Sequence, residues 1–132
     1  MFKAKHIMKT NPACVRPEMP IYDALRLLAN SNVTCVPVVD KDLKLVATLD
    51  ENDALRLIYE NEEQSGNCVS DFMNTGCISA DANTNLIDLC EQLMDKACRL
   101  IPIVDNGVLQ GVTNRSDLIR AILRIKHQEL PE

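Results

Sequence analysis

Two short stretches of this 132-residue chain place charged and polar side chains in a spacing that could hold a ligand. They are Asp50-Glu51-Asn52-Asp53 and Asn114-Arg115-Ser116-Asp117. Each starts with a residue that caps helix N-termini well and carries an aspartate three positions later. The free N–H groups and partial positive charge of a helix N-terminus favour a bound anion such as a phosphate. The same spacing also fits a capping box, in which both side chains satisfy the helix's own N–H groups.

The two stretches differ in the charge that they bring to the helix end. Asn114 is neutral and can donate a hydrogen bond, and Arg115 follows it directly. Arg99 stands just before a predicted strand in the same half of the chain, so two guanidinium groups are expected near Asn114. Asp50 instead brings a carboxylate that would repel a phosphate. We therefore predict that the second stretch is the better anion site.

The elements that position these stretches are written twice in the sequence. The run Val36-Pro37-Val38-Val39-Asp40 recurs 65 residues later as Ile101-Pro102-Ile103-Val104-Asp105. The same offset relates Met8 to Met73, whereas Asp53 and Asp117 lie 64 residues apart. One residue is therefore missing from the second copy, in the hairpin turn that follows Asp105.

Each copy predicts a short extended piece, a helix, two strands and a second helix, from the periodicity of its apolar residues. In the first copy these are Cys14-Val15, a helix burying Ile21, Ala24, Leu25 and Leu28, strands over 34–39 and 45–49, and a helix from Asp50 burying Ala54, Leu55, Leu57 and Ile58. In the second copy they are Cys77-Ile78, a helix burying Leu86, Leu89, Cys90 and Leu93, strands over 100–104 and 108–113, and a helix from Asn114. Asn30 to Asn32 should end the first helix, and Asn106-Gly107 should form a tight turn between strands.

The repeat fixes the expected domain organisation. We predict one copy over residues 1–60, a polar linker over 61–67 and a second copy over 68–128. A unit of about sixty residues buries too little apolar surface to be comfortably stable alone. The predicted fold is therefore α/β (α+β), with two β-α-β-β-α repeats packed with pseudo-twofold symmetry and two equivalent clefts between them.

Composition excludes several classes of function. With 46% hydrophobic and 25% charged residues, the chain has the composition of an ordinary globular protein. A net charge of −5 provides no basic field for nucleic acid or anionic lipid, and no apolar run is long enough to cross a membrane. The six cysteines include no C-x-x-C pair, and the two histidines stand at opposite ends of the chain. We therefore expect no metal site, buried reduced thiols and a cytoplasmic location.

The order of these features resembles the CBS motif, and two of them in tandem resemble a CBS pair, also called a Bateman module. The features are Met8, Val15, the helix on Ile21, the Val-Pro-Val-Val-Asp strand and a return strand ending just before Asp53. The resemblance covers residues 5–126. Because no catalytic or transport domain accompanies the repeats, the chain resembles a stand-alone member of the family.

The resemblance implies a non-catalytic regulatory module that binds an adenosyl ligand such as AMP, ADP, ATP or S-adenosylmethionine in the cleft between the motifs. It also implies a homodimer and a regulated partner protein, with no required cofactor. The family's aspartate, which takes the ribose hydroxyls, is kept here as Asp53 and Asp117. The hydroxyl residue three positions earlier is replaced by Asp50 and Asn114.

Carried over to this sequence, the resemblance gives two sets of ligand-binding residues. The favoured set is Cys77, Ile78, Arg99, Leu100, Ile101, Pro102, Asn114, Arg115 and Asp117. The weaker set is Cys14, Val15, Cys35, Val36, Pro37, Asp50 and Asp53. The replaced hydroxyl residues keep open an alternative, a ligand-free interaction or dimerisation module. An enzyme or thiol redox protein is disfavoured, because neither histidine stands near a cysteine as base beside nucleophile.

Overall fold

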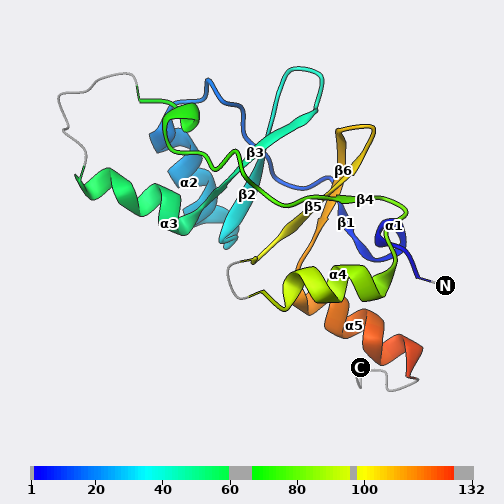
Figure 1. The fold of residues 1–132 in the computed structure, drawn as a ribbon. Helices are drawn as coiled ribbons and strands as arrows, with labels where there is room; N and C mark the ends of the chain where they lie inside the picture. The colour runs from blue at the N-terminus through cyan, green and yellow to red at the C-terminus, as the bar shows by residue number, and fades with distance from the viewer. Residues whose placement is uncertain (1, 60–66, 96–97, 127–132) are drawn as a thin grey trace. The chain divides into compact units, whose positions relative to one another are not determined.

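The computed structural model describes residues 2–59, 67–95 and 98–126, and the chain separates into two compact units (Figure 1). Ala13–Cys77 form the first-repeat unit. Met1–Pro12 together with Ile78–Glu132 form the second-repeat unit. The predicted linker lies outside the described residues except for Asn67. Each unit therefore contains the start of the other repeat, an exchange that the repeat boundaries alone do not reveal.

The first-repeat unit is built around one antiparallel strand pair. Its elements are α2 (Ile21–Ser31), β2 (Cys35–Val39), β3 (Leu45–Asp50), α3 (Glu51–Leu55) and two 3-10 helices, Arg56–Tyr59 and Val69–Asp71. Cys35 lies opposite Asp50, and Pro37 lies opposite Thr48. Val15 adds a single parallel bridge to Val38 on one side, and Asn74 adds an antiparallel bridge to Thr48 on the other.

The second-repeat unit has the same strand arrangement with longer outer strands. Its elements are α1 (Ala4–Ile7), β1 (Lys9–Thr10), β4 (Ala80–Asp81), α4 (Leu86–Leu93), β5 (Ile101–Asp105), β6 (Val108–Thr113) and α5 (Arg115–Ile125). The strand order is β1-β6-β5-β4, in which β1 is antiparallel to β6 and β4 is parallel to β5. The sequence therefore predicted the mixed α/β fold and its two repeats correctly.

One expected strand lies elsewhere. Cys77-Ile78 was predicted as the extended piece of the second copy, but the paired residues are Ala80 and Asp81, which align with Ile103 and Val104 of β5. Ala80 is thus the counterpart of Val15, whose parallel partner is Val38. The prediction was wrong because such a short piece has no periodicity of its own, and its register depends on the neighbouring strand.

Each unit has its own apolar core. In the first-repeat unit α2 packs Ile21, Ala24 and Leu28 against the inner face of β2 and β3, as its periodicity predicts. Val69 and Phe72, from the exchanged start of the second repeat, complete this core. In the second-repeat unit Leu89 and Leu93 of α4 and Leu118 of α5 pack on Ile101 and Ile103, and Ala4 of α1 is fully buried beside them.

The helix that follows β3 differs from its prediction. Leu55 was expected to be buried, but its side chain is 67% exposed. The α-helix ends at Leu55 and continues as a 3-10 helix. Leu55 directly follows the buried Ala54, and in a helix of 3.6 residues per turn its side chain therefore faces well away from the side on which Ala54 and Leu57 pack. Ala54 is buried and Leu57 packs against the core, as predicted, whereas the side chain of Ile58 lies outside the described residues.

The turns follow the local sequence signals. Asn32 ends α2 in the left-handed conformation, with φ of 53°. Asn106 and Gly107 both have positive φ, 50° and 81°, as expected for an Asn-Gly hairpin. Within the described part of the chain, no helix is long and apolar enough to span a membrane.

Gly111 on β6 allows β1 to approach closely. A Cβ atom there would lie 2.5 Å from the backbone oxygen of Lys9 and 2.8 Å from the sulfur of Met8. Glycine is therefore required for the pairing that attaches the N-terminal segment to the second-repeat unit.

Candidate functional site

The N-terminus of α5 holds Asn114 and Asp117 in a mutual capping arrangement. Oδ1 of Asn114 accepts a hydrogen bond from the N–H of Asp117, and Oδ2 of Asp117 accepts one from the N–H of Asn114, both at 3.0 Å. The capping interpretation of this spacing is therefore confirmed. It uses only one of the two carboxylate oxygens of Asp117.

The second carboxylate oxygen of Asp117 faces two cations. Oδ1 lies 3.7 Å from Nζ of Lys9 and 3.6 Å from a guanidinium nitrogen of Arg120. Asp117 is only 7% exposed, whereas the side chains of Lys9 and Arg120 are 59% and 54% exposed. A buried carboxylate therefore presents one oxygen between two cations that reach solvent.

Neither cation was among the residues predicted for the site. Arg120 could have been found, because it stands three residues after Asp117 on one helix and such pairs face each other. Lys9 depends on the pairing of β1 with β6, which aligns Lys9 with Val112 two residues before Asn114. No local signal announces that pairing.

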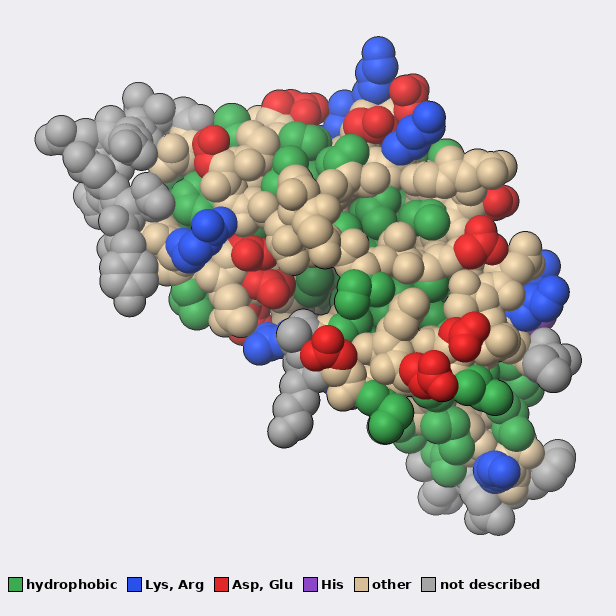
Figure 2. All heavy atoms as spheres, viewed as in Figure 1, with side chains coloured by type: hydrophobic (Ala, Val, Ile, Leu, Met, Phe, Trp, Pro, Cys, Tyr) green, Lys and Arg blue, Asp and Glu red, His purple; other side chains and the backbone are tan. Residues whose placement is uncertain are grey.

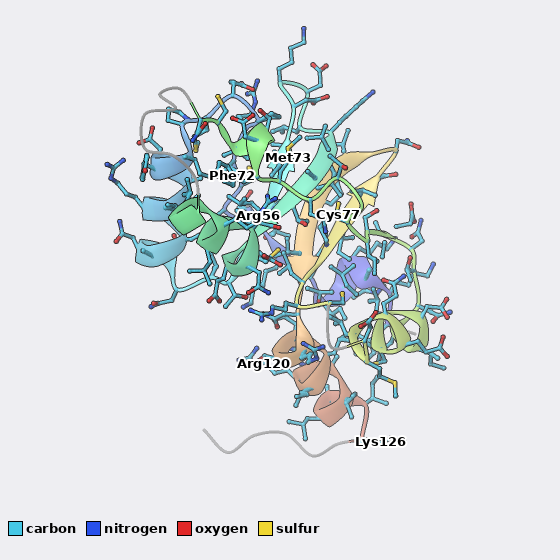
Figure 3. The ribbon with its side chains drawn as sticks, turned by 60° about the vertical axis from the view of Figure 1, so that its left-hand side comes forward. Arg56, Phe72, Met73, Cys77, Arg120 and Lys126 are labelled. Atoms are coloured by element: carbon cyan, nitrogen blue, oxygen red, sulfur yellow. The ribbon has the colours of Figure 1, made fainter. Side chains whose placement is uncertain are left out.

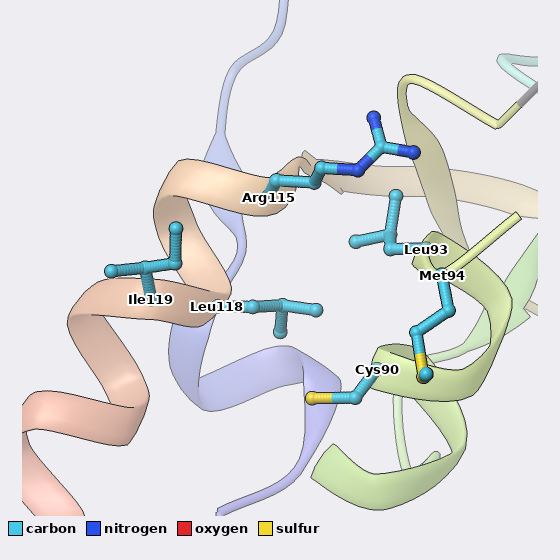
Figure 4. Close-up of a pocket in the computed structure, with 6 residues that line it drawn as sticks. All are labelled: Cys90, Leu93, Met94, Arg115, Leu118 and Ile119. Atoms are coloured by element: carbon cyan, nitrogen blue, oxygen red, sulfur yellow. The ribbon is translucent and has the colours of Figure 1, made fainter. Parts of the chain in front are cut away.

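The predicted arginines behave differently. Arg115 extends across the groove between α4 and α5, where its guanidinium donates to the backbone oxygen of Asp95 at 2.9 Å (Figure 4). It points away from the carboxylate of Asp117 because residues two apart lie on different sides of a helix. Arg99 is exposed in the segment just before β5.

The strand residues of the favoured set divide by face. The side chain of Ile101 is fully buried in the core, so only its backbone groups are available to a ligand. Pro102 is buried, Leu100 is half-buried and Ile78 is exposed. If these residues contact the base of an adenosyl ligand, the apolar contacts would therefore come from the side chains of Leu100, Pro102 and Ile78.

The start of α3 repeats the capping arrangement with two carboxylates. Oδ1 of Asp50 accepts from the N–H of Asp53 at 2.9 Å, and Oδ2 of Asp53 accepts from the N–H of Asp50 at 3.0 Å. Burial raises the pKa of Asp53, and the neighbouring Asp50 carboxylate raises it further. Arg56 acts in the opposite direction, but its guanidinium donates to the backbone oxygen of Phe72 at 2.7 Å and lies over the Phe72 ring (Figure 3). The N-terminal end of α3 is therefore acidic.

The outer face of the β2–β3 pair carries polar side chains. Cys35 and Asp50 lie opposite each other, as do Pro37 and Thr48, so the four share one face. Burial raises the pKa of the Cys35 thiol to about 12, with further contributions from Asp50 and Asp53. Burial also raises the pKa of Cys77. A raised pKa opposes a role for either thiol as a nucleophile at neutral pH.

Some of the remaining residues predicted for the weaker site are buried inside the first-repeat unit. Val15 and Val36 are buried in the core, Pro37 is buried, and Cys14 is half-buried. As with Ile101, the two valines can offer a ligand only backbone groups. Among the described residues, no cluster of His, Cys, Asp and Glu is arranged to hold a metal ion.

Comparison with known proteins identifies the repeats. Residues 4–60 and residues 69–124 each match the CBS domain. The chain belongs to the CBS domain family. As a CBS protein it is 29% identical to the CBS domain-containing protein YhcV of Bacillus subtilis, over 98% of this chain and 99% of YhcV.

Solved CBS structures share the fold. The crystal structure of CBSX2 in complex with AMP is 31% identical in sequence, with a TM-score of 0.85 over 96% of this chain and 99% of that chain. The chloroplastic protein CBSX1 of Arabidopsis thaliana is 29% identical, and the match spans 59% of its length. The match to a catalytic relative, the A-adding tRNA nucleotidyltransferase of Aquifex aeolicus, spans only 14% of that enzyme.

Proposed function

We propose that this CBS protein is a non-catalytic regulatory module that binds an adenine nucleotide, with Asp117 holding the ribose hydroxyls. The observation that carries the proposal is the position of the Asp117 carboxylate. One oxygen caps the helix, and the other is held beyond hydrogen-bond length from Lys9 and Arg120. That second oxygen is free to accept a hydrogen bond from a sugar hydroxyl. The AMP complex of CBSX2 supports the choice of ligand class.

Charge favours this end of α5 over the start of α3 for a ligand that carries phosphate. Lys9 and Arg120 both reach solvent beside Asp117, and the cap residue Asn114 is neutral. At α3 the cap is Asp50, its neighbour is Asp53, and Arg56 is engaged by Phe72. A phosphate would thus meet two cations at α5 and two carboxylates at α3. ADP, ATP and S-adenosylmethionine share the adenosyl group of AMP. They differ in the number of phosphate groups, and this is the difference that the charges at the two helix ends would discriminate.

Isothermal titration calorimetry with AMP tests the proposal. Asp117→Ala is expected to weaken AMP binding at least tenfold, because it removes the acceptor for the ribose hydroxyls. Asp53→Ala is the matched control, because it removes the equivalent capping carboxylate of the first-repeat unit. Circular dichroism confirms that both variants fold. Equal affinity of Asp117→Ala and the unsubstituted protein would contradict the proposal.

A second candidate function is an interaction module without a ligand. Its support is that both aspartates are already used as helix caps and that neither repeat carries the hydroxyl residue of the family's motif. Thermal melting separates the two candidates. A ligand at a hundred times its dissociation constant adds about 2.7 kcal/mol to the free energy of unfolding. No shift with AMP, ADP, ATP or S-adenosylmethionine would favour the second candidate.

The same module is proposed to form a homodimer through α4 and α5. Apolar side chains gather over these two helices at the lower right of Figure 2. Met94 and Ile119 are 79% and 57% exposed, and both line an open groove of about 530 Å³ that also includes Leu93 and Leu118 (Figure 4). A second copy would offer the same apolar face, so each face would cover the other.

Sedimentation velocity tests the dimer. Ile119→Glu is expected to shift the protein toward the monomer, because it places a charge in the apolar groove. Leu43→Glu is the matched control, because Leu43 is a similarly exposed apolar residue in the turn between β2 and β3. An unchanged sedimentation coefficient for Ile119→Glu would contradict an interface on this face. A regulated partner protein is part of the proposed role, and binding of AMP would change its state.

A further inference from the structure

Each unit is completed by a short arm from the start of the other repeat. Residues 3–10, called here the Lys9 arm, belong to the second-repeat unit and pair with β6 (Figure 1). Residues 68–74, called the Asn74 arm, belong to the first-repeat unit, in which Asn74 bridges Thr48 of β3. Lys9 and Asn74 stand 65 residues apart, which is the offset of the repeat, and so occupy equivalent positions.

The two arms differ in how firmly apolar contacts hold them. The Asn74 arm buries Val69 and Phe72 in the core of its unit, with exposed fractions of 0% and 3%. At the equivalent positions the Lys9 arm has Ala4, which is fully buried but smaller than valine, and Ile7, which is only half-buried. Docking of the Lys9 arm therefore removes less apolar surface from water, and segments with few buried apolar contacts open most readily.

The two arms also differ in the charge that they bring to the capping aspartate. The Lys9 ammonium lies 3.7 Å from Oδ1 of Asp117. Asn74, at the equivalent position, is neutral, and its side-chain oxygen accepts a hydrogen bond from the N–H of Gly76 at 3.0 Å. At this position the weakly anchored arm thus brings a cation to the proposed nucleotide site, and the firmly anchored arm does not.

We propose that the Lys9 arm is a strap that closes on the second-repeat unit when an adenine nucleotide binds beside Asp117, a role that rests on the proposed function. In the free protein, an ion pair that reaches solvent adds little to the docking of the arm. A bound nucleotide would bring a phosphate, a second anion, to the Lys9 ammonium. The unit with its arm docked would therefore bind the nucleotide more tightly, and binding would shift the arm toward its docked state.

Thermodynamic linkage sets the size of this shift. If docking of the arm raises the affinity for the nucleotide by some factor, saturating nucleotide raises the docking equilibrium by the same factor. Lys9→Met removes the ammonium and leaves the backbone pairing of the arm in place. The fold-loss of AMP affinity in Lys9→Met should therefore match the factor by which AMP suppresses opening of the arm in the unsubstituted protein.

Amide hydrogen exchange of the full-length protein, followed by NMR, tests the proposal. The reporters are the N–H groups of Ala4 and Lys5. They donate to the backbone oxygens of Thr84 and Ala82, at 2.8 and 2.9 Å, and exchange when the arm opens. Saturating AMP is expected to slow their exchange several-fold. In Lys9→Met, at an AMP concentration that saturates the variant, no such slowing is expected.

Two controls make the result specific. Lys5→Met removes an exposed cation from the same arm, and its arm amides should respond to AMP as those of the unsubstituted protein do. The N–H of Val69 donates to the backbone oxygen of Met19 at 2.9 Å and reports on the Asn74 arm. Any response of Val69 to AMP should be the same in Lys9→Met and in the unsubstituted protein.

Calorimetry on the same samples distinguishes failure of the strap from failure of the proposed function. Binding of AMP without slower exchange at Ala4 and Lys5 would overturn the strap and leave nucleotide binding intact. Equal slowing in Lys9→Met would also overturn it, because the arm would then be held by something other than the ammonium. Absence of any AMP binding would contradict the proposed function, and the strap with it.

Discussion

Nζ of Lys9 lies 3.7 Å from Oδ1 of Asp117, although the two residues stand near opposite ends of the sequence. The contact exists because β1 pairs with β6, directly before the helix that carries Asp117. The start of the first repeat thus supplies a cation to the capping carboxylate of the second.

Loss of the Lys9 ammonium is expected to affect binding more than folding. Lys9→Met should lower the free energy of unfolding by less than about 1 kcal/mol, because the Lys9 ammonium reaches solvent and Arg120 and the N–H of Asn114 still face the buried Asp117 carboxylate. AMP affinity should fall several-fold, and the difference should shrink in high salt, which screens the charge. Urea unfolding and calorimetry measure the two effects. Lys5→Met, an exposed lysine on the same segment, is the control, and an equal loss of affinity there would contradict a specific role for Lys9.

Gly111→Ala is expected to detach or strain the N-terminal strand. The new Cβ would lie 2.5 Å from the backbone oxygen of Lys9, which cannot move without disturbing the β1–β6 pairing. Overpacking of this kind costs about 1–3 kcal/mol. Gly76→Ala is the control, because its Cβ would meet only the side chain of Asn74, at 3.5 Å. Urea unfolding of both variants measures the difference, and equal stabilities would show that β1 adapts freely.

Thr113→Val is expected to stabilise the protein. The hydroxyl oxygen of Thr113 is buried and has no hydrogen-bond partner among the described residues. Valine has the same shape without the polar atom, and removal of such an unsatisfied group should add about 1 kcal/mol to the free energy of unfolding. Thr48→Val is the control and should bring no gain, because Thr48 is also buried but its hydroxyl is not among the buried groups without a hydrogen-bond partner. A loss of stability in Thr113→Val would mean that the hydroxyl is satisfied in solution.

Asp53→Asn is expected to change how stability depends on pH. Because burial and Asp50 raise the pKa of Asp53 in the folded protein, its favourable contribution is complete below the unfolded-state pKa, about 3.9, and is lost as pH rises through the folded value. Asparagine cannot ionise, and its amide oxygen can still accept the N–H of Asp50. The variant should therefore gain stability relative to the unsubstituted protein between about pH 4 and pH 7.

Asp40→Asn provides a control of opposite sign. Hydrogen bonds from the N–H groups of Lys44 and Asp42 lower the pKa of Asp40. Its contribution is present above the unfolded-state pKa and lost as pH falls, so any deficit of Asp40→Asn should diminish toward low pH. Urea unfolding across this pH range measures both variants. Parallel curves for Asp53→Asn and the unsubstituted protein would contradict the raised pKa.

Features that depend on three or four neighbouring residues could be predicted from the sequence. The capping pair of Asn114 and Asp117, the left-handed end of α2 at Asn32 and the Asn106-Gly107 turn are all local. The repeat added the order of elements, because a run as distinctive as Val-Pro-Val-Val-Asp marks the same strand wherever it occurs. The family, and with it the class of fold, could be predicted from these local features and the repeat.

Tertiary structure decided which residues surround those local features. Lys9 reaches Asp117 only through strand pairing, and the backbone oxygen of Asp95 that Arg115 contacts is likewise supplied by a distant segment. The sequence by itself determined the repeated scaffold and its helix caps, because their signals act over a few residues. The exchange of segments between the units was decided by packing, because its contacts join residues far apart in the chain.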